Sequence, residues 1–305
     1  MMTLDLIAIG EPLIEFNQDR EAPGLYRAGF GGDTSNCVIA ASRLGARCAY
    51  LSQVGDDVFG RQLLALWREE GVDASGVRTA GGADTGLYFV THGAEGHSFS
   101  YRRAGSAASR MTPGGMPLTR VAEARFLHCS GISQAISRSA RDTVAQAMRI
   151  AREAGTRISY DLNFRPRLWP AERALAEALA TLPHCDLFFP SIDEVRLLTG
   201  LSAPEDVIDW SHRHGAKAVV LKLGAQGSLV SEGNGAVEVP PHPVQALDAT
   251  GAGDCFAGAC LARLAAGDTL AQAARAANIA AALSTRGYGA ITPLPRWPDV
   301  RALLG

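Results

Sequence analysis

Short apolar runs alternate with amphipathic segments along most of this chain, and this alternation constrains the fold more than any other feature. The apolar runs are rich in β-branched or aromatic residues, as is typical of strands buried on both faces. They are residues 4–9, 48–54, 126–129, 157–162, 186–189 and 218–221. The amphipathic segments have helical spacing and cover residues 35–44, 59–70, 139–153, 171–181 and 204–214. Several of them are followed by a glycine, where a helix would stop. The pattern predicts an α/β fold, with a mainly parallel sheet covered by helices on both faces.

Two segments, residues 25–31 and residues 86–101, do not follow this alternation of apolar runs and amphipathic segments. The second, GLYFVTHGAEGHSFSY, alternates apolar and polar residues around a Gly-rich turn, which favours a β-hairpin. We expect both to join a small separate sheet that serves as a lid, formed by about residues 11–34 and 84–108 of a single domain spanning 1–305. Because an exposed sheet can pair with another copy, we also expect a homo-oligomer formed through the lid.

The charge balance and the start of the chain exclude several classes of function. The net charge of the 305 residues is −2, without a basic excess, so we expect no nucleic-acid or anionic-membrane partner. The start of the chain has neither the charge pattern of a signal peptide nor an apolar stretch of about 20 residues. The 6 cysteines contain no C-x-x-C pair, which argues against a zinc site or a disulfide framework. We therefore expect a cytoplasmic protein that acts on small molecules.

The sequence from Leu247 to Gly258 carries the strongest chemical signal. Gly251, Ala252 and Gly253 permit close backbone approach to an anion at the start of an Ala-rich helix, where free N–H groups and the helix dipole favour negative charge. Asp254 lies in the same turn and could take a proton from an attacking hydroxyl. The alternative is that Asp254 is only a helix N-cap and that the glycines form only a tight turn.

Two motifs far apart in the chain carry a family resemblance. GGDTSN at 31–36 and DATGAGDCFAG at 248–258 resemble the two hallmark motifs of the ribokinase or PfkB family of carbohydrate kinases. Further matches follow in the family order: DLNFR at 161–165, PSIDE at 190–194, LKLGAQG at 221–227 and ANIA at 277–280. The resemblance covers essentially the whole chain and implies a ribokinase-like three-layer α/β/α domain with a small β-sheet lid.

The resemblance also implies ATP and Mg²⁺ as co-substrates, Asp254 as general base, and an anion hole made by Gly251, Ala252, Gly253 and the Asp254 amide. Residues expected to bind the nucleotide are Ser191, Glu194, Lys222, Gly224, Gly227, Gly251, Gly253 and Asn278. Ser191 stands where the family usually has Asn, so Glu194 is the expected organiser of Mg²⁺, acting indirectly. Asp248 and Thr250 raise the further hypothesis of a monovalent cation beside the anion hole.

The fragments expected to face the sugar resemble those of 2-keto-3-deoxygluconate kinases. Arg103 and Arg165 could hold a substrate carboxylate by paired, charge-assisted hydrogen bonds. Tyr101 and Arg103 alternate along the expected strand, so both side chains would lie on one face of the lid, together with Tyr88. The alternative is that the tyrosines are amphipathic lid residues and that Arg103 is solvated. An Arg after Asp-x-Asn also resembles fructokinases.

The first motif supplies the remaining substrate contacts. Gly31 and Gly32 would let the backbone approach the substrate, and Asp33 and Asn36 could bond its hydroxyls from the helix start. Asp33 is equally well explained as a simple helix cap. Three further acidic residues stay outside the predicted site. Glu11 and Glu15 lie at or just beyond the first expected strand, where α/β proteins place ligands, but either could be only a solvated loop carboxylate. Asp161 could orient Mg²⁺ or substrate, or only hold a neighbouring loop.

These observations predict an ATP-dependent kinase that phosphorylates 2-keto-3-deoxygluconate at O6. The alternatives are a fructokinase or a ribokinase of the same family. A sugar or nucleotide sensor that keeps the fold without turnover is a third alternative, although such a protein would not need Asp254.

Overall fold

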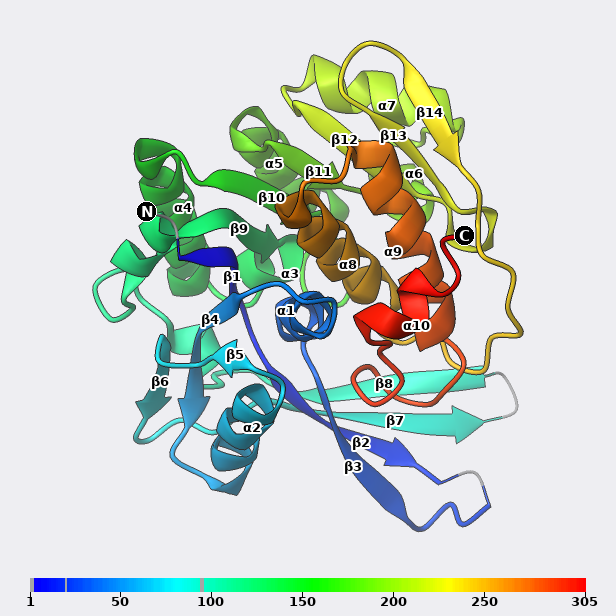
Figure 1. Ribbon diagram of the computed structural model, residues 1–305. Helices are drawn as coiled ribbons and strands as arrows, with labels where there is room; N and C mark the ends of the chain where they lie inside the picture. The colour runs from blue at the N-terminus through cyan, green and yellow to red at the C-terminus, as the bar shows by residue number, and fades with distance from the viewer. Residues whose placement is uncertain (1–2, 20, 94–95) are drawn as a thin grey trace.

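A twisted, mainly parallel sheet forms the centre of the protein in the computed structural model, which describes residues 3–19, 21–93 and 96–305 (Figure 1). Its strand order is β14-β13-β12-β11-β10-β9-β1-β4-β5, and β6 pairs with β4 beside this path. The strands are β1 (Leu4–Ile9), β4 (Cys48–Gly55), β5 (Val72–Asp73), β6 (Val77–Ala80), β9 (Ala124–Ser130), β10 (Arg157–Asp161), β11 (Leu187–Phe189), β12 (Ala218–Lys222), β13 (Ser228–Ser231) and β14 (Ala236–Val239).

The six predicted apolar runs correspond to β1, β4, β9, β10, β11 and β12, which run parallel to one another. The antiparallel strands β13 and β14 at the edge were not predicted. Three of the four residues of β14 are exposed, so this edge strand lacks the apolar run that marks a buried one.

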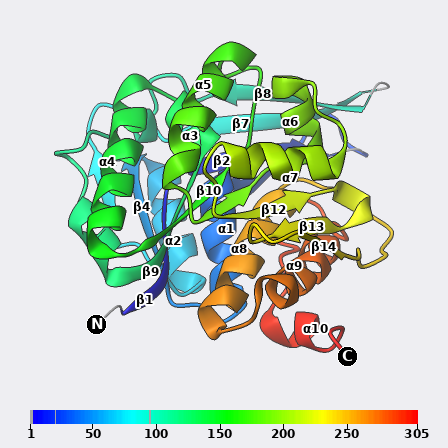
Figure 2. The same ribbon diagram turned by 90° about the horizontal axis from the view of Figure 1, so that it is seen from above.

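Helices cover both faces of the central sheet, as predicted (Figure 2). Side chains alternate along each strand. Leu6 and Ala8 therefore join the core under α1, α8 and α9, while Ile7 and Ile9 join the core under α4, α5 and α7. The helices are α1 (Asp33–Arg43), α2 (Val58–Glu69), α3 (Gly131–Ala135), α4 (Arg138–Ala154), α5 (Ala171–Thr181), α6 (Ile192–Thr199), α7 (Pro204–Arg213), α8 (Ala252–Ala266), α9 (Leu270–Ser284) and α10 (Trp297–Arg301).

The four glycines that follow the predicted helices, Gly45, Gly71, Gly155 and Gly215, have a positive φ of 94°, 70°, 77° and 102°. Within residues 3–19, 21–93 and 96–305, none of the helices combines the length and the apolar character needed to cross a lipid bilayer.

Helices α1 and α8 pack closely against each other, and this contact positions the site. A Cβ placed on Gly258 of α8 would lie 2.2 Å from the carbonyl oxygen of Cys37 in α1. Only glycine permits the two backbones to approach this far. The starts of both helices, which carry the two hallmark motifs, consequently face each other.

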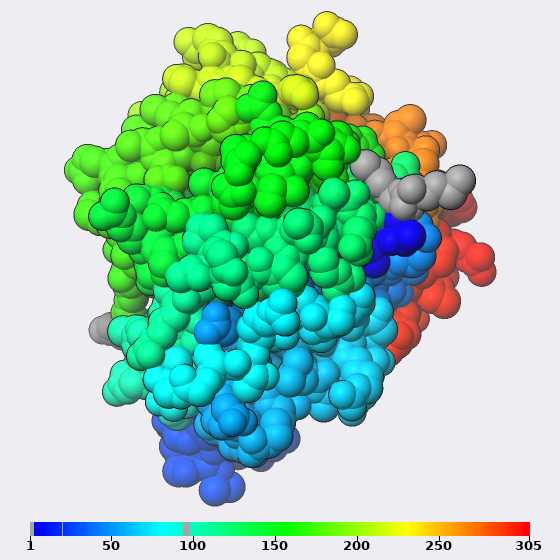
Figure 3. Space-filling view, turned by 90° about the vertical axis from the view of Figure 1, so that its left-hand side faces the viewer, coloured from blue at the N-terminus to red at the C-terminus, as the bar shows by residue number. Residues whose placement is uncertain are grey.

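A second sheet of order β3-β2-β7-β8 stands apart from the central one. Its strands are β2 (Leu13–Gln18), β3 (Tyr26–Gly31), β7 (Leu87–Gly93) and β8 (Gly96–Arg102). Strand β2 pairs antiparallel with β3 and parallel with β7, and it thereby joins the two distant segments that the sequence pointed to. In the space-filling view, the blue residues of β2 and β3 project below the rest of the molecule (Figure 3). Residues 94–95 of the predicted hairpin turn lie outside the described residues.

Candidate active site

The start of α8 offers main-chain amides to a ligand. Gly251 precedes the helix with a φ of 75°, and a Cβ there would lie 2.9 Å from the Cβ of Ala290, so glycine fits both the conformation and the space. The amide of Ala252 donates to the Ala249 carbonyl oxygen. Among the described residues, the amides of Gly253 and Asp254 have no backbone hydrogen-bond partner. Two unsatisfied N–H groups at a helix start form an anion-binding site.

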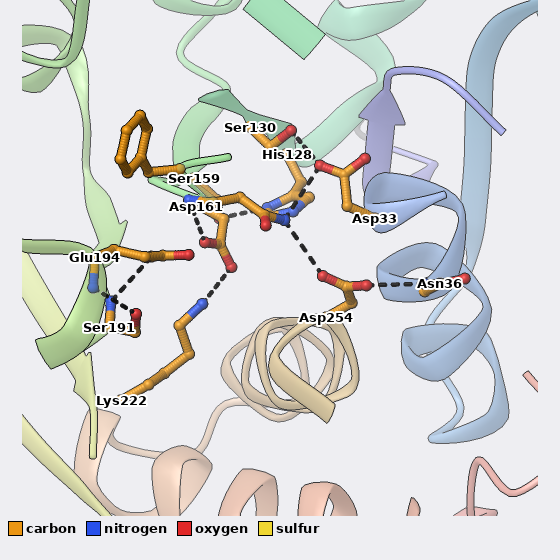
Figure 4. A network of polar contacts seen from close by, with 12 residues as sticks. Asp33, Asn36, His128, Ser130, Ser159, Asp161, Ser191, Glu194, Lys222 and Asp254 are labelled. Atoms are coloured by element: carbon orange, nitrogen blue, oxygen red, sulfur yellow. Dashed lines mark hydrogen bonds and ion pairs between the residues drawn. The ribbon is translucent and has the colours of Figure 1, made fainter. Parts of the chain in front are cut away.

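Two side-chain amides hold the carboxylate of Asp254 in place (Figure 4). Asn36 Nδ2 donates to Oδ2 at 2.8 Å, and Asn163 Nδ2 donates to Oδ1 at 3.4 Å. Asp254 is the third residue of α8, and the N-cap is Gly251. The interpretation of Asp254 as an N-cap is therefore wrong. Its carboxylate is directed toward α1 and the end of β10, beside the free amides.

Burial, and after it the neighbouring carboxylate of Asp33, raise the pKa of Asp254 to about 8. Hydrogen bonding from Asn36 and the charge of Arg165 act in the opposite direction. A carboxyl group with such a pKa can accept a proton near neutral pH. Perturbation of this kind, by burial and by a like charge, is common at catalytic sites.

Asp33 lies at the first position of α1 and does not cap it. The N-cap is Gly32, with a φ of 106°, so the cap interpretation of Asp33 is wrong as well. Asp33 Oδ2 accepts hydrogen bonds from Ser130 Oγ and, at 3.3 Å, from Asn163 Nδ2. Its Oδ1 is buried and has no hydrogen-bond partner in the described part of the chain, and the same holds for Oδ1 of Asn36. Buried acceptors of this kind are satisfied by donors such as hydroxyl groups.

Lys222 places a positive charge next to the helix-start amides. Its Nζ donates to Asp161 Oδ2 at 2.6 Å, and both side chains are largely buried. A Cβ on Gly253 would lie 3.6 Å from Nζ, which shows how close the ammonium group is to the turn. The free amides and this ammonium group together suit a polyanion.

Ser191 and Glu194 form a capping box at the start of α6. The Ser191 hydroxyl accepts from the Glu194 amide, and Glu194 Oε2 accepts from the Ser191 amide, both at 3.3 Å. Glu194 Oε1 accepts from Arg165 Nη1 at 3.2 Å, and the Arg165 side chain is 48% exposed. Burial raises the pKa of Glu194. Serine in place of the usual asparagine thus preserves the helix cap.

Three predicted nucleotide residues lie around β13 and β14. Gly227, with a φ of 92°, closes the turn after β12, where a Cβ would lie 2.4 Å from the Val239 carbonyl oxygen, and Gly224 belongs to the same turn. Asn278 Nδ2 donates to the carbonyl oxygens of Val239 and Pro240, both at 3.0 Å. These contacts anchor the segment after β14. Nucleotide binding by the three residues stays a prediction.

Tyr88 and Tyr101 face each other across β7 and β8, with ring centroids 5.9 Å apart. Tyr88 Oη donates to Glu15 Oε2. A Cβ on Gly31 would lie 2.6 Å from that hydroxyl oxygen, so Gly31 makes room for Tyr88 as well as for any ligand. Glu15 is only 3% exposed, which corrects its interpretation as a solvated loop carboxylate.

Arg103 follows β8 and points to the junction between the small sheet and the central one. Its Nε donates to Glu11 Oε2 at 2.7 Å, and Ser106 Oγ donates to Oε1 of the same carboxylate. Glu11 is fully buried, so its interpretation as a solvated carboxylate is also wrong. Nη2 of Arg103 forms an ion pair with Glu11 but makes no hydrogen bond of good geometry to any described residue. A Cβ on Gly32 would lie 2.4 Å from the Glu11 carbonyl oxygen, so Gly32 is required for this packing.

The neighbourhood of the hypothetical monovalent cation is held together by protein contacts. Asp248 Oδ1 accepts from the amide and the hydroxyl of Thr250, at 2.9 and 2.6 Å. Its Oδ2 accepts from the Gly289 amide at 3.0 Å. These bonds fix the turn before α8, and a cation there stays a prediction.

A cavity of about 600 Å³ lies between the small sheet and the loop after α9. It is lined by residues of β2 and β3 and by residues 288–292, and Glu15 reaches it. Ala290, which packs against Gly251, also lines it. The cavity therefore adjoins the helix-start turn, and its volume suits a small molecule.

Comparison with known proteins places this geometry in a class. The family model of the pfkB family carbohydrate kinases matches residues 3–297. The chain is 36% identical to fructokinase-1 of Zea mays over 315 residues, covering 98% of this chain and 97% of that protein. It is also 36% identical to 2-dehydro-3-deoxygluconokinase of Thermoproteus tenax over 304 residues, covering 96% of this chain and 92% of that protein. Fructokinase with bound ATP from Xylella fastidiosa has a TM-score of 0.88 at 26% identity and covers 98% of both chains.

Fold and sequence matches together define a carbohydrate kinase. The chain belongs to the PfkB family, and its fold is ribokinase-like.

Proposed function

We propose that this chain transfers the γ-phosphoryl group of ATP to O6 of 2-keto-3-deoxygluconate. The observation that carries the proposal is the position of Asp254, a partly buried carboxylate in the same helical turn as two amides that have no backbone partner among the described residues. Such a turn can ionise an alcohol while it holds the incoming phosphate. The match to 2-dehydro-3-deoxygluconokinase of Thermoproteus tenax supports the choice of acceptor.

Two guanidinium groups support an acidic acceptor over a neutral sugar. Both Arg103 and Arg165 lie near carboxylates of the site. Burial raises the pKa of Asp33 and of Asp254, and the charge of Arg103 opposes the shift of Asp33 while that of Arg165 opposes the shift of Asp254. Arg103 already pairs with the buried carboxylate of Glu11, so a substrate carboxylate would share this guanidinium group and take Arg165 as a second donor.

The reaction would proceed by in-line displacement. Asp254 accepts the proton of the O6 hydroxyl as the new O–P bond forms, and the bond between the γ-phosphorus and the β–γ bridging oxygen breaks, leaving ADP. The free amides of Gly253 and Asp254 and the ammonium group of Lys222 stabilise the negative charge on the transferred group. The unpartnered acceptors of Asp33 and Asn36 would orient the other hydroxyls.

Magnesium accompanies ATP in reactions of this kind, where it neutralises charge on the phosphates. In the described part of the chain, no group of three His, Cys, Asp or Glu side chains could hold a metal ion. Phosphate oxygens and water would then supply most of the ligands, with Glu194 as a neighbouring carboxylate.

A panel assay tests the substrate. ADP release is measured with 2-keto-3-deoxygluconate, fructose and ribose at equal concentrations, and we expect the highest kcat/KM for the sugar acid. Phosphorus NMR of the product should place the ester at O6. A higher kcat/KM for fructose would instead favour the fructokinase alternative, which the 36% identity to the maize enzyme supports. The absence of ADP release with all three sugars would favour the sensor.

We further propose that the outer face of the small sheet pairs with a second copy of the chain. Phe16 and Phe89 stack on this face with ring centroids 5.2 Å apart, and Tyr26 and Leu25 beside them are 41% and 63% exposed. Exposed apolar surface of this kind favours association. We expect light scattering to give the mass of a dimer, and Leu25→Lys combined with Tyr26→Lys to give a monomer. A monomeric parent protein would contradict the proposal.

A further inference from the structure

Asp254 is held from the side of β10 by a hydrogen bond from Asn163, which lies in the short segment 161–163 at the end of that strand. Asn163 has a φ of 38°, and among the described residues it is the only one other than glycine with a positive φ. Asparagine is one of the few residues that adopt this conformation at low cost. The unusual backbone turns its side chain back toward α1 and α8.

The amide of Asn163 is shared between two carboxylates. Nδ2 donates to Asp33 Oδ2 at 3.3 Å and to Asp254 Oδ1 at 3.4 Å, and the residue is 4% exposed. An NH₂ group has two hydrogens, so it can bond both acids at once. It therefore separates two like charges and fixes the orientation of the proposed base.

The carboxylate of Asp161 accepts hydrogen bonds from both Asn163 and Lys222. Its Oδ1 accepts from the Asn163 main-chain N–H at 3.1 Å, and its Oδ2 accepts from Lys222 Nζ at 2.6 Å. Asp161 is 2% exposed, and these two bonds occupy one oxygen each. This arrangement favours the holding role over the orientation of Mg²⁺ or substrate, the two alternatives that the sequence left open.

We propose that Asp161 and Asn163 are positioning residues that align the base with the phosphate-binding cation. One oxygen of Asp161 accepts from the main chain of Asn163 and fixes the turn from which the Asn163 side chain bonds Asp254. The other oxygen accepts from Lys222 and holds its ammonium group beside Gly253. One buried carboxylate thus links the two halves of the phosphoryl-transfer site. The inference rests on the proposed function, because it assigns a purpose to the position of Asp254.

Asn163→Gly tests the positioning role, because glycine keeps the positive φ and the main-chain N–H but removes the side-chain amide. We expect kcat to fall by about ten- to hundredfold, the scale of a misplaced catalytic group. The KM values for sugar and ATP should change less than threefold. The rise of kcat/KM with pH should move to higher pH, because loss of a donor disfavours the charged form of Asp254. A role confined to folding would not move this pH dependence.

Asn234→Gly is the matched control, since Asn234 lies in the exposed turn between β13 and β14 and should tolerate the change. Asp161→Asn should lower kcat and also raise the KM for ATP, because it weakens the hold on Lys222. Thermal unfolding confirms that each variant is folded.

Two results would overturn the inference. One is a kcat of Asn163→Gly within twofold of the parent, and the other is a sugar KM that rises more than kcat falls, since that would make Asn163 a substrate ligand. Asp254→Asn, assayed alongside, distinguishes a failure of the proposed function from a failure of the positioning role. Full turnover of that variant would reject the proposed function itself, whereas its inactivity beside a fully active Asn163→Gly would reject only the positioning role.

Discussion

Asp254→Asn should lower kcat by about two to four orders of magnitude, which is the usual scale for the loss of a general base. The variant keeps the shape of the side chain but cannot accept the hydroxyl proton. Folding should be maintained or slightly improved, because burial and the neighbouring Asp33 disfavour the ionised form of Asp254 and asparagine carries no charge. Steady-state kinetics with saturating sugar and ATP measures the effect, and calorimetry checks that ATP still binds.

The dependence of kcat/KM on pH tests whether Asp254 is the titrating group. With a pKa of about 8, the base is mostly protonated at pH 7, so kcat/KM should rise about tenfold per pH unit below pH 8 and level off above it. The residual activity of Asp254→Asn should lack this rise. If the variant keeps near-normal turnover, or the same rise with pH, then another group removes the proton.

The central fold was predictable from the sequence because its strands are buried on both faces. Such strands form continuous apolar runs, and β1, β4 and β9 to β12 were found that way. The β14 strand, mostly exposed, has no such run. The small sheet was recognisable from the alternation in 86–101, whereas its strand β2 was not singled out.

The motifs indicated a candidate site, but they did not reveal which side chains contact one another within it. Asp254 and Asn36 are 218 residues apart, and only the close packing of α1 on α8 brings them within 2.8 Å. Asn163 was in a recognised motif but was not assigned a role, although an Asp-x-Asn pair at a strand end was the available signal. Glu11 and Glu15 looked like loop carboxylates because their burial depends on the distant residues Arg103 and Tyr88.

The ion pair between Arg103 and the distant Glu11 makes Arg103→Ala the change with the largest expected effect on stability. Arg103 and Glu11 are 10% and 0% exposed, and they join the end of β8 to the segment after β1. Removal of the guanidinium leaves a buried carboxylate without its cation. Loss of one partner of a buried ion pair costs about 3–5 kcal/mol, so we expect a much lower urea midpoint for the variant.

The loss of stability caused by Arg103→Ala should depend on pH in a defined direction. Burial raises the pKa of Glu11, and Arg103 opposes this shift. Without Arg103, folded Glu11 therefore binds its proton more tightly than unfolded Glu11 does. The free energy of unfolding of Arg103→Ala should then fall, relative to the parent, as pH rises above the unfolded pKa of the carboxyl group. Urea titrations of both proteins at several pH values measure this difference.

The double variant Glu11→Gln with Arg103→Met separates the structural role of Arg103 from its proposed role with the substrate. It removes both charges and keeps most of the volume, so most of the lost stability should return. The sugar-acid KM should remain raised in both variants while the KM for ATP changes little, because neither keeps a guanidinium for the carboxylate. A double variant with normal sugar-acid KM would mean that Arg103 serves the junction of the two sheets and that Arg165 alone, or another group, holds the substrate carboxylate.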